Sequence, residues 1–287
     1  MSDRLKVLPQ YLMPKQAMTR LAGRIASRPL GGVTTAAIRR FVARYGVDMA
    51  EAAEPDITAY KTFNDFFTRA LKAGARPLAD APLVCPVDGA ISQVGRIEGD
   101  QVFQAKGQSF TTAALVGGDA RLAARFRDGL FANLYLSPRD YHRIHMPAAG
   151  RLVRMVHVPG ALFSVNPTTA RGVPGLFARN ERVVCVFDDD DLGRWVLVLV
   201  GATIVGSMAT VWHGRIRREG PVREWDYAPG QVALAQGDEM GRFLLGSTVV
   251  MLFERSALRF NPAWRPGGAV RMGEAMAGWP AEATIRR

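Results

Sequence analysis

Short apolar segments rich in β-branched residues, separated by Gly, Pro and Asp, follow one another from Pro82 to Phe260. Segments of this length and spacing are typical of β-strands in a compact domain. The sequence therefore predicts a β-rich domain, a barrel or a sandwich of short strands, with one helical stretch at residues 113–127. The expected strands are residues 83–84, 90–91, 101–103, 131–136, 152–158, 182–187, 195–200, 204–212, 231–235 and 248–253.

The region before this domain shows helical periodicity instead. Pro9 and Pro14 restrict any helix ahead of residue 15. Thr34 or Thr35 is expected to cap one helix, and Thr62 another. Helices are expected at residues 15–27, 34–45 and 62–71, with a further helical turn at 48–54. We therefore expect an α+β protein, with amphipathic helices in residues 1–77 and the β-rich domain in residues 78–287.

Positive charge is concentrated at the N-terminus of a chain with a net charge of +11 and a pI near 10.3. Residues 1–46 contain nine Lys or Arg and a single acid, Asp3, interleaved with apolar residues. This pattern favours a helix lying on an anionic lipid surface, and a solvated basic face is the alternative. Nucleic acid is disfavoured as a partner because no nucleic-acid-binding motif accompanies the charge.

Residues 195–212 carry no charge over a length close to that of a membrane span. Gly201 and Gly206 interrupt the stretch, so two adjacent buried strands are favoured over a spanning helix. No secretory signal is recognisable at the N-terminus, and the protein is expected on the cytoplasmic side of a membrane. Cys85 and Cys185 lie in apolar segments and are expected to be buried thiols.

Gly246 and Ser247 stand directly before an apolar, β-branched run that ends at Glu254. Glycine has no Cβ, so its carbonyl is open to attack by the hydroxyl of the next residue. This arrangement permits self-cleavage by an N-to-O acyl shift. An ordinary turn is the alternative interpretation of a Gly-Ser-Thr triplet.

One acid and two histidines are candidates to act on Ser247. Asp88 precedes Gly89, and His142 and His145 lie three residues apart in a polar loop. An Asp that orients a His, which then takes a proton from a Ser, is the general arrangement for activating a hydroxyl nucleophile. A turn-forming Asp and structural histidines are the alternatives. No third ligand at a suitable spacing supports a metal site.

Residues 240–243 leading into 245–248 form a processing signature, and further matching segments lie on both sides of it. They are residues 12–15, 21–23, 47–49, 60, 62–64, 66–67, 86–89, 104–107, 135–147, 158–160, 163–166, 176–182 and 200–207. On these segments the chain resembles the bacterial phosphatidylserine decarboxylase proenzymes over nearly its whole length.

The resemblance implies an enzyme that processes itself. Asp88 and His145 would deprotonate Ser247 for attack on the carbonyl of Gly246. Elimination and loss of ammonia would then turn Ser247 into a pyruvoyl group, the covalent cofactor. The products would be a β chain of residues 1–246 and an α chain of residues 247–287 that stay associated as a heterodimer. Further homo-oligomerisation is left open.

The resemblance also implies the reaction. The pyruvoyl group would form a Schiff base with phosphatidylserine, and loss of carbon dioxide would give phosphatidylethanolamine. His142 is a candidate for placing the substrate carboxylate or delivering the proton. Phe163, Ser164 and Asn166 are candidates to line the lipid pocket, with packing as the alternative. The enzyme would serve phospholipid biosynthesis as a peripheral protein on the cytoplasmic side of the cell membrane.

Two other hypotheses remain open. One is an unprocessed, basic lipid-binding module. The other is a pyruvoyl decarboxylase that acts on a different serine-headed lipid.

Overall fold

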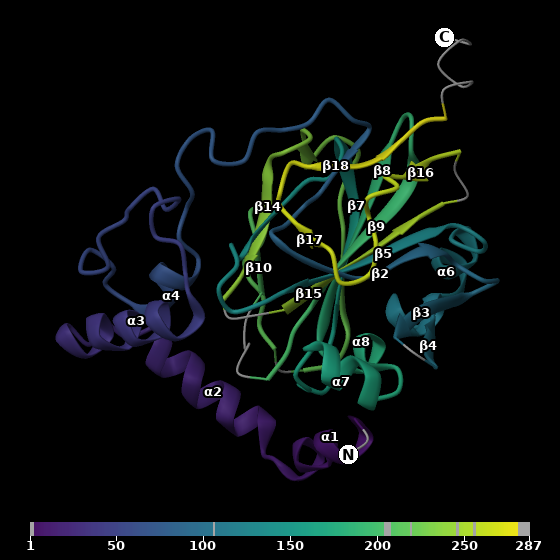
Figure 1. Ribbon diagram of the computed structural model, residues 1–287. Coiled ribbons are helices and arrows are strands. Elements are labelled where there is room, and N and C mark those ends of the chain that lie inside the picture. The colour runs from purple at the N-terminus through teal and green to yellow at the C-terminus, as the bar shows by residue number, and fades with distance from the viewer. Residues whose placement is uncertain are drawn as a thin grey trace.

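The computed structural model describes residues 3–105, 107–203, 208–218, 220–244, 247–254 and 257–280 of the 287-residue chain. Three helices open the chain and form a row along one side of a strand-rich body (Figure 1). They are α1 (Asp3–Leu12), α2 (Lys15–Ala26) and α3 (Gly32–Tyr45), and the short α4 (Phe63–Phe67) packs beside α3. The predicted α+β class is confirmed.

The middle of the strand-rich body is one large antiparallel sheet, with the strand order β12-β7-β8-β9-β15-β5-β2-β17 and with β13 paired to β7. Its strands are β2 (Gly89–Arg96), β5 (Leu130–Leu136), β7 (Gly150–Val158), β8 (Arg182–Asp189), β9 (Gly193–Val200), β12 (Arg223–Asp226), β13 (Ala233–Leu234), β15 (Ser247–Phe253) and β17 (Ala269–Val270).

Smaller sheets lie around the large one. The strand order β11-β10-β14-β6 joins β6 (Arg143–His145), β10 (Met208–Thr210), β11 (Gly214–Arg215) and β14 (Glu239–Phe243). A three-stranded sheet has the order β1-β18-β16 and contains β1 (Leu83–Val84), β16 (Arg259–Phe260) and β18 (Ala275–Gly278). The hairpin of β3 (Gln101–Ala105) and β4 (Gln108–Thr111) stands apart from both.

The central strands of the large sheet are buried on both faces. Along β15, Val249 and Met251 belong to one core cluster, whereas Val250 and Leu252 belong to the other. The first cluster is closed by the two smaller sheets and the second by the β3–β4 hairpin and short helices. These helices are α5 (Thr112–Leu115), α6 (Ala120–Arg125), α7 (Pro167–Gly172) and α8 (Leu176–Arg179). The strand is apolar at successive positions because neither face meets solvent, and the layers fit the predicted sandwich.

Helix α1 was not expected from the sequence, because Pro9 lies inside it. Proline removes one backbone hydrogen bond from a helix interior. The helix persists because it packs on α7, where the buried side chain of Val7 lies against Gly172. Arg171 of α7 also donates to Asp3 at 2.6 Å. Tertiary contacts of this kind outweigh local propensity in short helices.

The other N-terminal expectations are partly confirmed. Helix α2 matches the predicted segment, and Thr62 caps α4 through a capping box with Asp65. The predicted capping of α3 by Thr34 or Thr35 is wrong, because the helix begins at Gly32. The hydroxyl of Thr34 instead accepts a hydrogen bond from the backbone N–H of Leu30 at 3.1 Å.

Residues 48–54 form turns rather than the predicted helical turn. Lys72 N–H donates to the carbonyl of Glu51 at 2.9 Å, and Ala53 N–H donates to the carbonyl of Ala70 at 2.9 Å. The segment therefore pairs with the chain that follows α4, which also ends that helix early. Ile38, Val47, Phe66 and Phe67 form a small core of their own in this region. The division of the chain at residue 77 stays a prediction.

Each predicted strand overlaps a strand of the structure, but residues 204–212 contribute only β10 among the described residues. The predicted helical stretch 113–127 is divided into α5 and α6 by Gly117 and Gly118. These glycines have φ angles of 89° and 96°, which residues with a Cβ rarely adopt. Local glycine geometry thus overrides the helical composition of the stretch.

Of the uncharged residues 195–212, residues 195–200 lie on β9 and residues 208–210 on β10, and residues 204–207 lie outside the described residues. Two strands are thus found as predicted, but they belong to different sheets. In the described part of the chain, no helix is both long and apolar enough to cross a membrane. Cys85 and Cys185 are buried free thiols, and burial raises the pKa of both.

Candidate active site

Asp88 lies directly before β2, where Gly89 allows the backbone to approach β5 closely. A Cβ on Gly89 would lie 2.3 Å from the carbonyl oxygen of Tyr135, so only glycine fits this position. The carboxylate of Asp88 is nearly buried and accepts from the Arg76 guanidinium at 2.6 to 3.1 Å. Met272 N–H donates to the same carboxylate at 2.9 Å.

Arg76 joins two acids at this position. Its Nη2 donates to Glu51 at 2.6 Å and to Asp88 at 2.6 Å. The bond to Asp88 raises the pKa of Arg76, and the bond to Arg76 lowers the pKa of Glu51. Asp88 is therefore held as a fixed, charge-paired carboxylate.

His145 lies on β6, and its backbone N–H donates to the carbonyl of Pro86 at 2.9 Å. Its Nδ1 is 2.8 Å from the carbonyl oxygen of Gly237, and its Nε2 is 3.0 Å from the hydroxyl of Tyr141. Since a carbonyl oxygen only accepts, Nδ1 carries the proton and Nε2 accepts from Tyr141. Burial lowers the pKa of His145 and raises the pKa of Tyr141 to about 12. Both groups are neutral at neutral pH.

Asp88 and His145 come together through the segment at Pro86. The backbone N–H of His145 on β6 donates to the carbonyl of Pro86, which stands two residues before Asp88 in the chain. Within the described residues the two side chains share no hydrogen bond, since Asp88 turns to Arg76 and His145 to Gly237. The predicted relay from Asp88 to His145 stays a prediction.

Ser247 is the first residue of β15 and lies at the same end of the sheet as Asp88. It stands opposite Leu136 of β5, and on the other side of β5 Ala90 stands opposite Tyr135. Adjacent strands are about 4.8 Å apart. The first residues of β2 and β15 therefore lie at the same edge of the sheet, separated only by β5. Gly246 and the side chain of Ser247 lie outside what the structure describes.

His142 is fully buried against Phe67, with a ring-centroid distance of 4.0 Å. Its Nδ1 donates to the carbonyl of Asp140 at 2.8 Å, whereas its Nε2 has no hydrogen-bond partner within the described residues. Burial lowers the pKa of His142 to about 3. Its backbone carbonyl accepts from Phe243 N–H at 3.0 Å, which places it beside the strand that leads into Ser247. His142 thus presents a neutral nitrogen with a free lone pair.

A pocket of about 360 Å³ opens beside these residues and is lined in part by Asp88, Tyr141 and Arg69. Arg69 is 5% exposed, and its Nε and Nη1 have no hydrogen-bond partner within the described residues. Its Nη2 donates to the carbonyl of Arg139 at 3.2 Å. Burial lowers the pKa of Arg69. The lining of the pocket thus includes a buried arginine two of whose donor atoms have no partner in the described structure.

Phe163, Ser164 and Asn166 each have a structural contact. The ring of Phe163 packs on Tyr11 with a centroid distance of 4.9 Å, and the backbone N–H of Ser164 donates to the side chain of Gln10 at 2.9 Å. Asn166 caps α7. These contacts favour packing, and the lining of a lipid pocket by the three residues stays a prediction.

Arg76, Tyr141 and Asn180 were not identified as site residues from the sequence. Asn180 is buried and donates to the carbonyls of Phe163 at 2.8 Å and Gly201 at 2.9 Å, which ties these segments to the end of β9. Tyr141 and Asn180 fall within segments that carry the resemblance, which was the available signal. Arg76 lies outside them, and an arginine before Pro77 has no distinguishing pattern.

Comparison with known proteins gives matches over nearly the whole chain. A family model described as phosphatidylserine decarboxylase matches residues 63–278, and one described as PSD matches residues 5–46. The phosphatidylserine decarboxylase proenzyme of Acidovorax ebreus is 72% identical over 279 residues, covering 96% of this chain and 98% of that protein. The proenzyme of Methylibium petroleiphilum is 71% identical over 279 residues, with the same coverage. That of Azoarcus sp. is 69% identical over 278 residues, covering 96% of each.

Proposed function

The chain belongs to the phosphatidylserine decarboxylase family, and from this premise we propose that it cleaves itself before Ser247 and removes carbon dioxide from phosphatidylserine to yield phosphatidylethanolamine. The observation that carries the proposal is the position of Ser247. It heads a central strand, at the sheet end where Asp88 and the His145 segment meet.

Self-cleavage begins when the hydroxyl oxygen of Ser247 bonds to the carbonyl carbon of Gly246 and the C–N bond breaks, which gives an ester. Removal of the α-proton of residue 247 then forms a Cα=Cβ double bond and breaks the Cβ–Oγ bond, which leaves a carboxylate on Gly246. Water releases the nitrogen as ammonia, and a pyruvoyl group remains at the head of β15. The pairing of β15 with both β5 and β9 supports this sequence of steps, because the hydrogen bonds to the two neighbouring strands keep β15 in the sheet after the peptide bond before Ser247 is cleaved.

His145 is the proposed base for this step. Burial keeps its imidazole neutral, and the bond from Nδ1 to Gly237 directs the lone pair of Nε2 away from that carbonyl. Tyr141 occupies this lone pair at 3.0 Å and has to turn away before Nε2 takes the proton of Ser247. Arg76 holds the carboxylate of Asp88 in place, and the negative charge of Asp88 favours the imidazolium that forms on His145.

A pyruvoyl group supplies the carbonyl that accepts the electrons left when carbon dioxide departs, which no ordinary side chain offers. Ser247 provides its atoms, and β5 and β9 hold it. His142 is the proposed partner of the substrate, since its Nε2 is neutral, buried and without a partner in the described structure. It holds or returns a proton at the substrate carbon.

The N-terminal helices support a peripheral position on a membrane. Of the fourteen exposed large hydrophobic side chains in the described residues, ten lie between Leu5 and Tyr45. Exposed apolar groups on basic helices bind the boundary between headgroups and acyl chains. We propose that these helices bring the enzyme to its lipid substrate on the cytoplasmic face of the cell membrane, in phospholipid biosynthesis.

The test is lipid product analysis with purified protein and vesicles that contain phosphatidylserine. We expect phosphatidylethanolamine and carbon dioxide from the wild type, none from Ser247→Ala, and wild-type yield from Ser109→Ala, at an exposed position of β4. A cleaved protein that yields no phosphatidylethanolamine would overturn the substrate assignment. Activity in Ser247→Ala would overturn the role of Ser247.

A further inference from the structure

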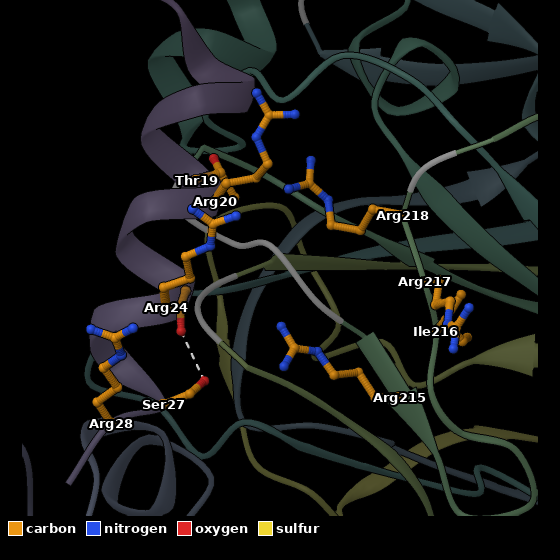
Figure 2. A pocket seen from close by; sticks show the side chains of 10 residues that line it. Thr19, Arg20, Arg24, Ser27, Arg28, Arg215, Ile216, Arg217 and Arg218 are labelled. Atoms are coloured by element: carbon orange, nitrogen blue, oxygen red, sulfur yellow. Dashed lines mark hydrogen bonds between the residues drawn. The ribbon is translucent and has the colours of Figure 1, made fainter.

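A pocket of about 690 Å³ lies between α2 and the segment from β11 to Arg218 (Figure 2). Six arginines line it, and no described lining residue is acidic. Arg20 and Arg24 lie on successive turns of α2, and Arg28 follows just after the end of the helix. Arg215, Arg217 and Arg218 form the other wall, and Figure 2 shows Arg215 and Arg218 pointing toward the helix. We call this the arginine pocket.

One arginine holds the walls together. Arg218 Nε donates to the buried carboxylate of Glu181 at 2.6 Å, and its Nη2 donates to Gln16 of α2 at 2.7 Å. Glu181 is 3% exposed and also contacts the imidazole of His157 at 3.0 Å. The ion pair with Glu181 thus fixes the second wall to the strand-rich body, and the bond to Gln16 joins this wall to α2.

Four of the pocket arginines have guanidinium groups with unused donors. The guanidinium groups of Arg20, Arg24, Arg28 and Arg217 make no hydrogen bond or ion pair with any described residue. Placing like charges around one cavity raises their mutual repulsion, which an anion in the cavity relieves. Guanidinium groups present paired N–H donors that match two oxygens of a phosphate. The pocket therefore suits a phosphate group.

The surroundings of the pocket indicate a lipid phosphate. Leu21 and Ile25, each one residue after a pocket arginine on α2, are 60% and 52% exposed. Leu8 and Leu12 of α1 are 54% and 90% exposed. A free phosphate needs no apolar surface beside its site, whereas a phospholipid presents its phosphate directly above the acyl chains.

The charge of the lining selects among headgroups. A serine or ethanolamine headgroup carries an ammonium group, which the arginines repel and which no acid in the described lining accepts. We propose that the arginine pocket binds the phosphate of an anionic phospholipid whose headgroup has no amine. Such a lipid seats α2 on the bilayer, in a pocket whose lining does not include Asp88 or His145. The proposal goes beyond the decarboxylase function and does not depend on it.

The test is flotation with phosphatidylcholine vesicles that contain phosphatidylglycerol, which the protein does not decarboxylate. The pocket variant is Arg20→Gln/Arg24→Gln/Arg217→Gln, at exposed positions without partners in the described structure. The matched control is Arg39→Gln/Arg40→Gln/Arg44→Gln, which removes the same charge from exposed positions on α3. We expect the pocket variant to lose at least about tenfold more vesicle affinity than the control. Equal losses would mean that only net charge matters and would overturn the proposal.

Two further arms identify the source of the phosphate. Millimolar inorganic phosphate or glycerol phosphate is expected to leave wild-type flotation unchanged, and full competition would assign the pocket to soluble phosphates. In the Ser247→Ala background, which consumes no lipid, phosphatidylglycerol is expected to bind more tightly than phosphatidylserine at equal surface charge. Equal binding that is lost equally in the pocket variant would overturn the exclusion of the amine.

Discussion

The guanidinium of Arg76 donates hydrogen bonds to both carboxylate oxygens of Asp88, at 2.6, 2.9 and 3.1 Å. The side chains of this pair are only 7% and 11% exposed, so the charges depend on each other for compensation. The acid that the sequence suggested as the partner of a histidine is thus held in place by a cation from the N-terminal region.

Replacing this cation tests the pair. Arg76→Gln leaves Asp88 and Glu51 without their shared partner, and we expect a loss of about 3 kcal/mol in the free energy of unfolding and self-cleavage slowed at least about tenfold. The matched control is Arg271→Gln, whose 62% exposed side chain contacts Glu51 from the surface and should matter little. Denaturant unfolding and the time course of cleavage on denaturing gels measure both effects. Equal, small effects of the two variants would contradict the role of Arg76.

Tyr141 occupies the lone pair of His145 that the proposed cleavage requires. Tyr141→Phe removes the hydroxyl, and we expect cleavage at the wild-type rate or faster, because Nε2 is then free. His145→Ala is expected to block cleavage, since no base remains. Both variants can be followed by pulse-chase or by gel. Slower cleavage in Tyr141→Phe would place the hydroxyl in the proton relay itself.

His142 is expected to act on the lipid and not on the peptide bond. His142→Ala should be cleaved normally and should lose about 100-fold or more in kcat, the usual scale for a positioned acid or base. Gel analysis of cleavage and assays of phosphatidylethanolamine formation separate the two steps. A variant that fails to cleave would show that the assigned division of roles is wrong.

The low pKa of His142 also predicts a pH dependence of stability. The imidazole has a pKa of about 3 in the fold, against 6.5 for an ordinary histidine, because burial disfavours its charged form. Between these values the unfolded chain binds a proton that the folded chain does not. The stability that the neutral His142 gives to the fold is therefore fully present above pH 6.5. As the pH falls from 6.5 toward 3, the free energy of unfolding decreases by about 1.4 kcal/mol per pH unit.

The variant His142→Asn provides the comparison for this slope, because its amide can still donate to the carbonyl of Asp140. Urea unfolding at a series of pH values should show a shallower decline for the variant than for the wild type. Parallel curves would mean that His142 is protonated in the fold at these pH values, contrary to its burial.

The sequence predicted the strands that are buried on both faces and missed several short or polar ones. Residues 195–200 of β9 and 249–253 of β15 are uncharged apolar runs, so their pattern identifies them. Strand β6 alternates Arg143 and His145 with the buried Ile144, and β14 combines Glu239 and Arg242 with the buried Met240 and Phe243, so neither strand is a continuous apolar run. Their pairing depends on contacts between distant segments, which local composition does not encode.

The candidate site was predicted to a similar extent. Asp88, His145 and Ser247 were proposed from motif and resemblance, and their backbone segments lie at one end of the sheets. The ion pair with Arg76 and the bond from Tyr141 to His145 are tertiary contacts. The arginine pocket likewise joins residues about 190 positions apart, such as Arg24 and Arg215.

The intact mass of the purified protein tests the central claim most directly. Cleavage before Ser247 with loss of ammonia predicts two chains, residues 1–246 and 247–287. The second should be lighter by one ammonia than a chain with an ordinary serine terminus, and it should react with a carbonyl reagent. A single chain at the full 31.3 kDa, or a second chain with a free amine on Ser247, would contradict the account.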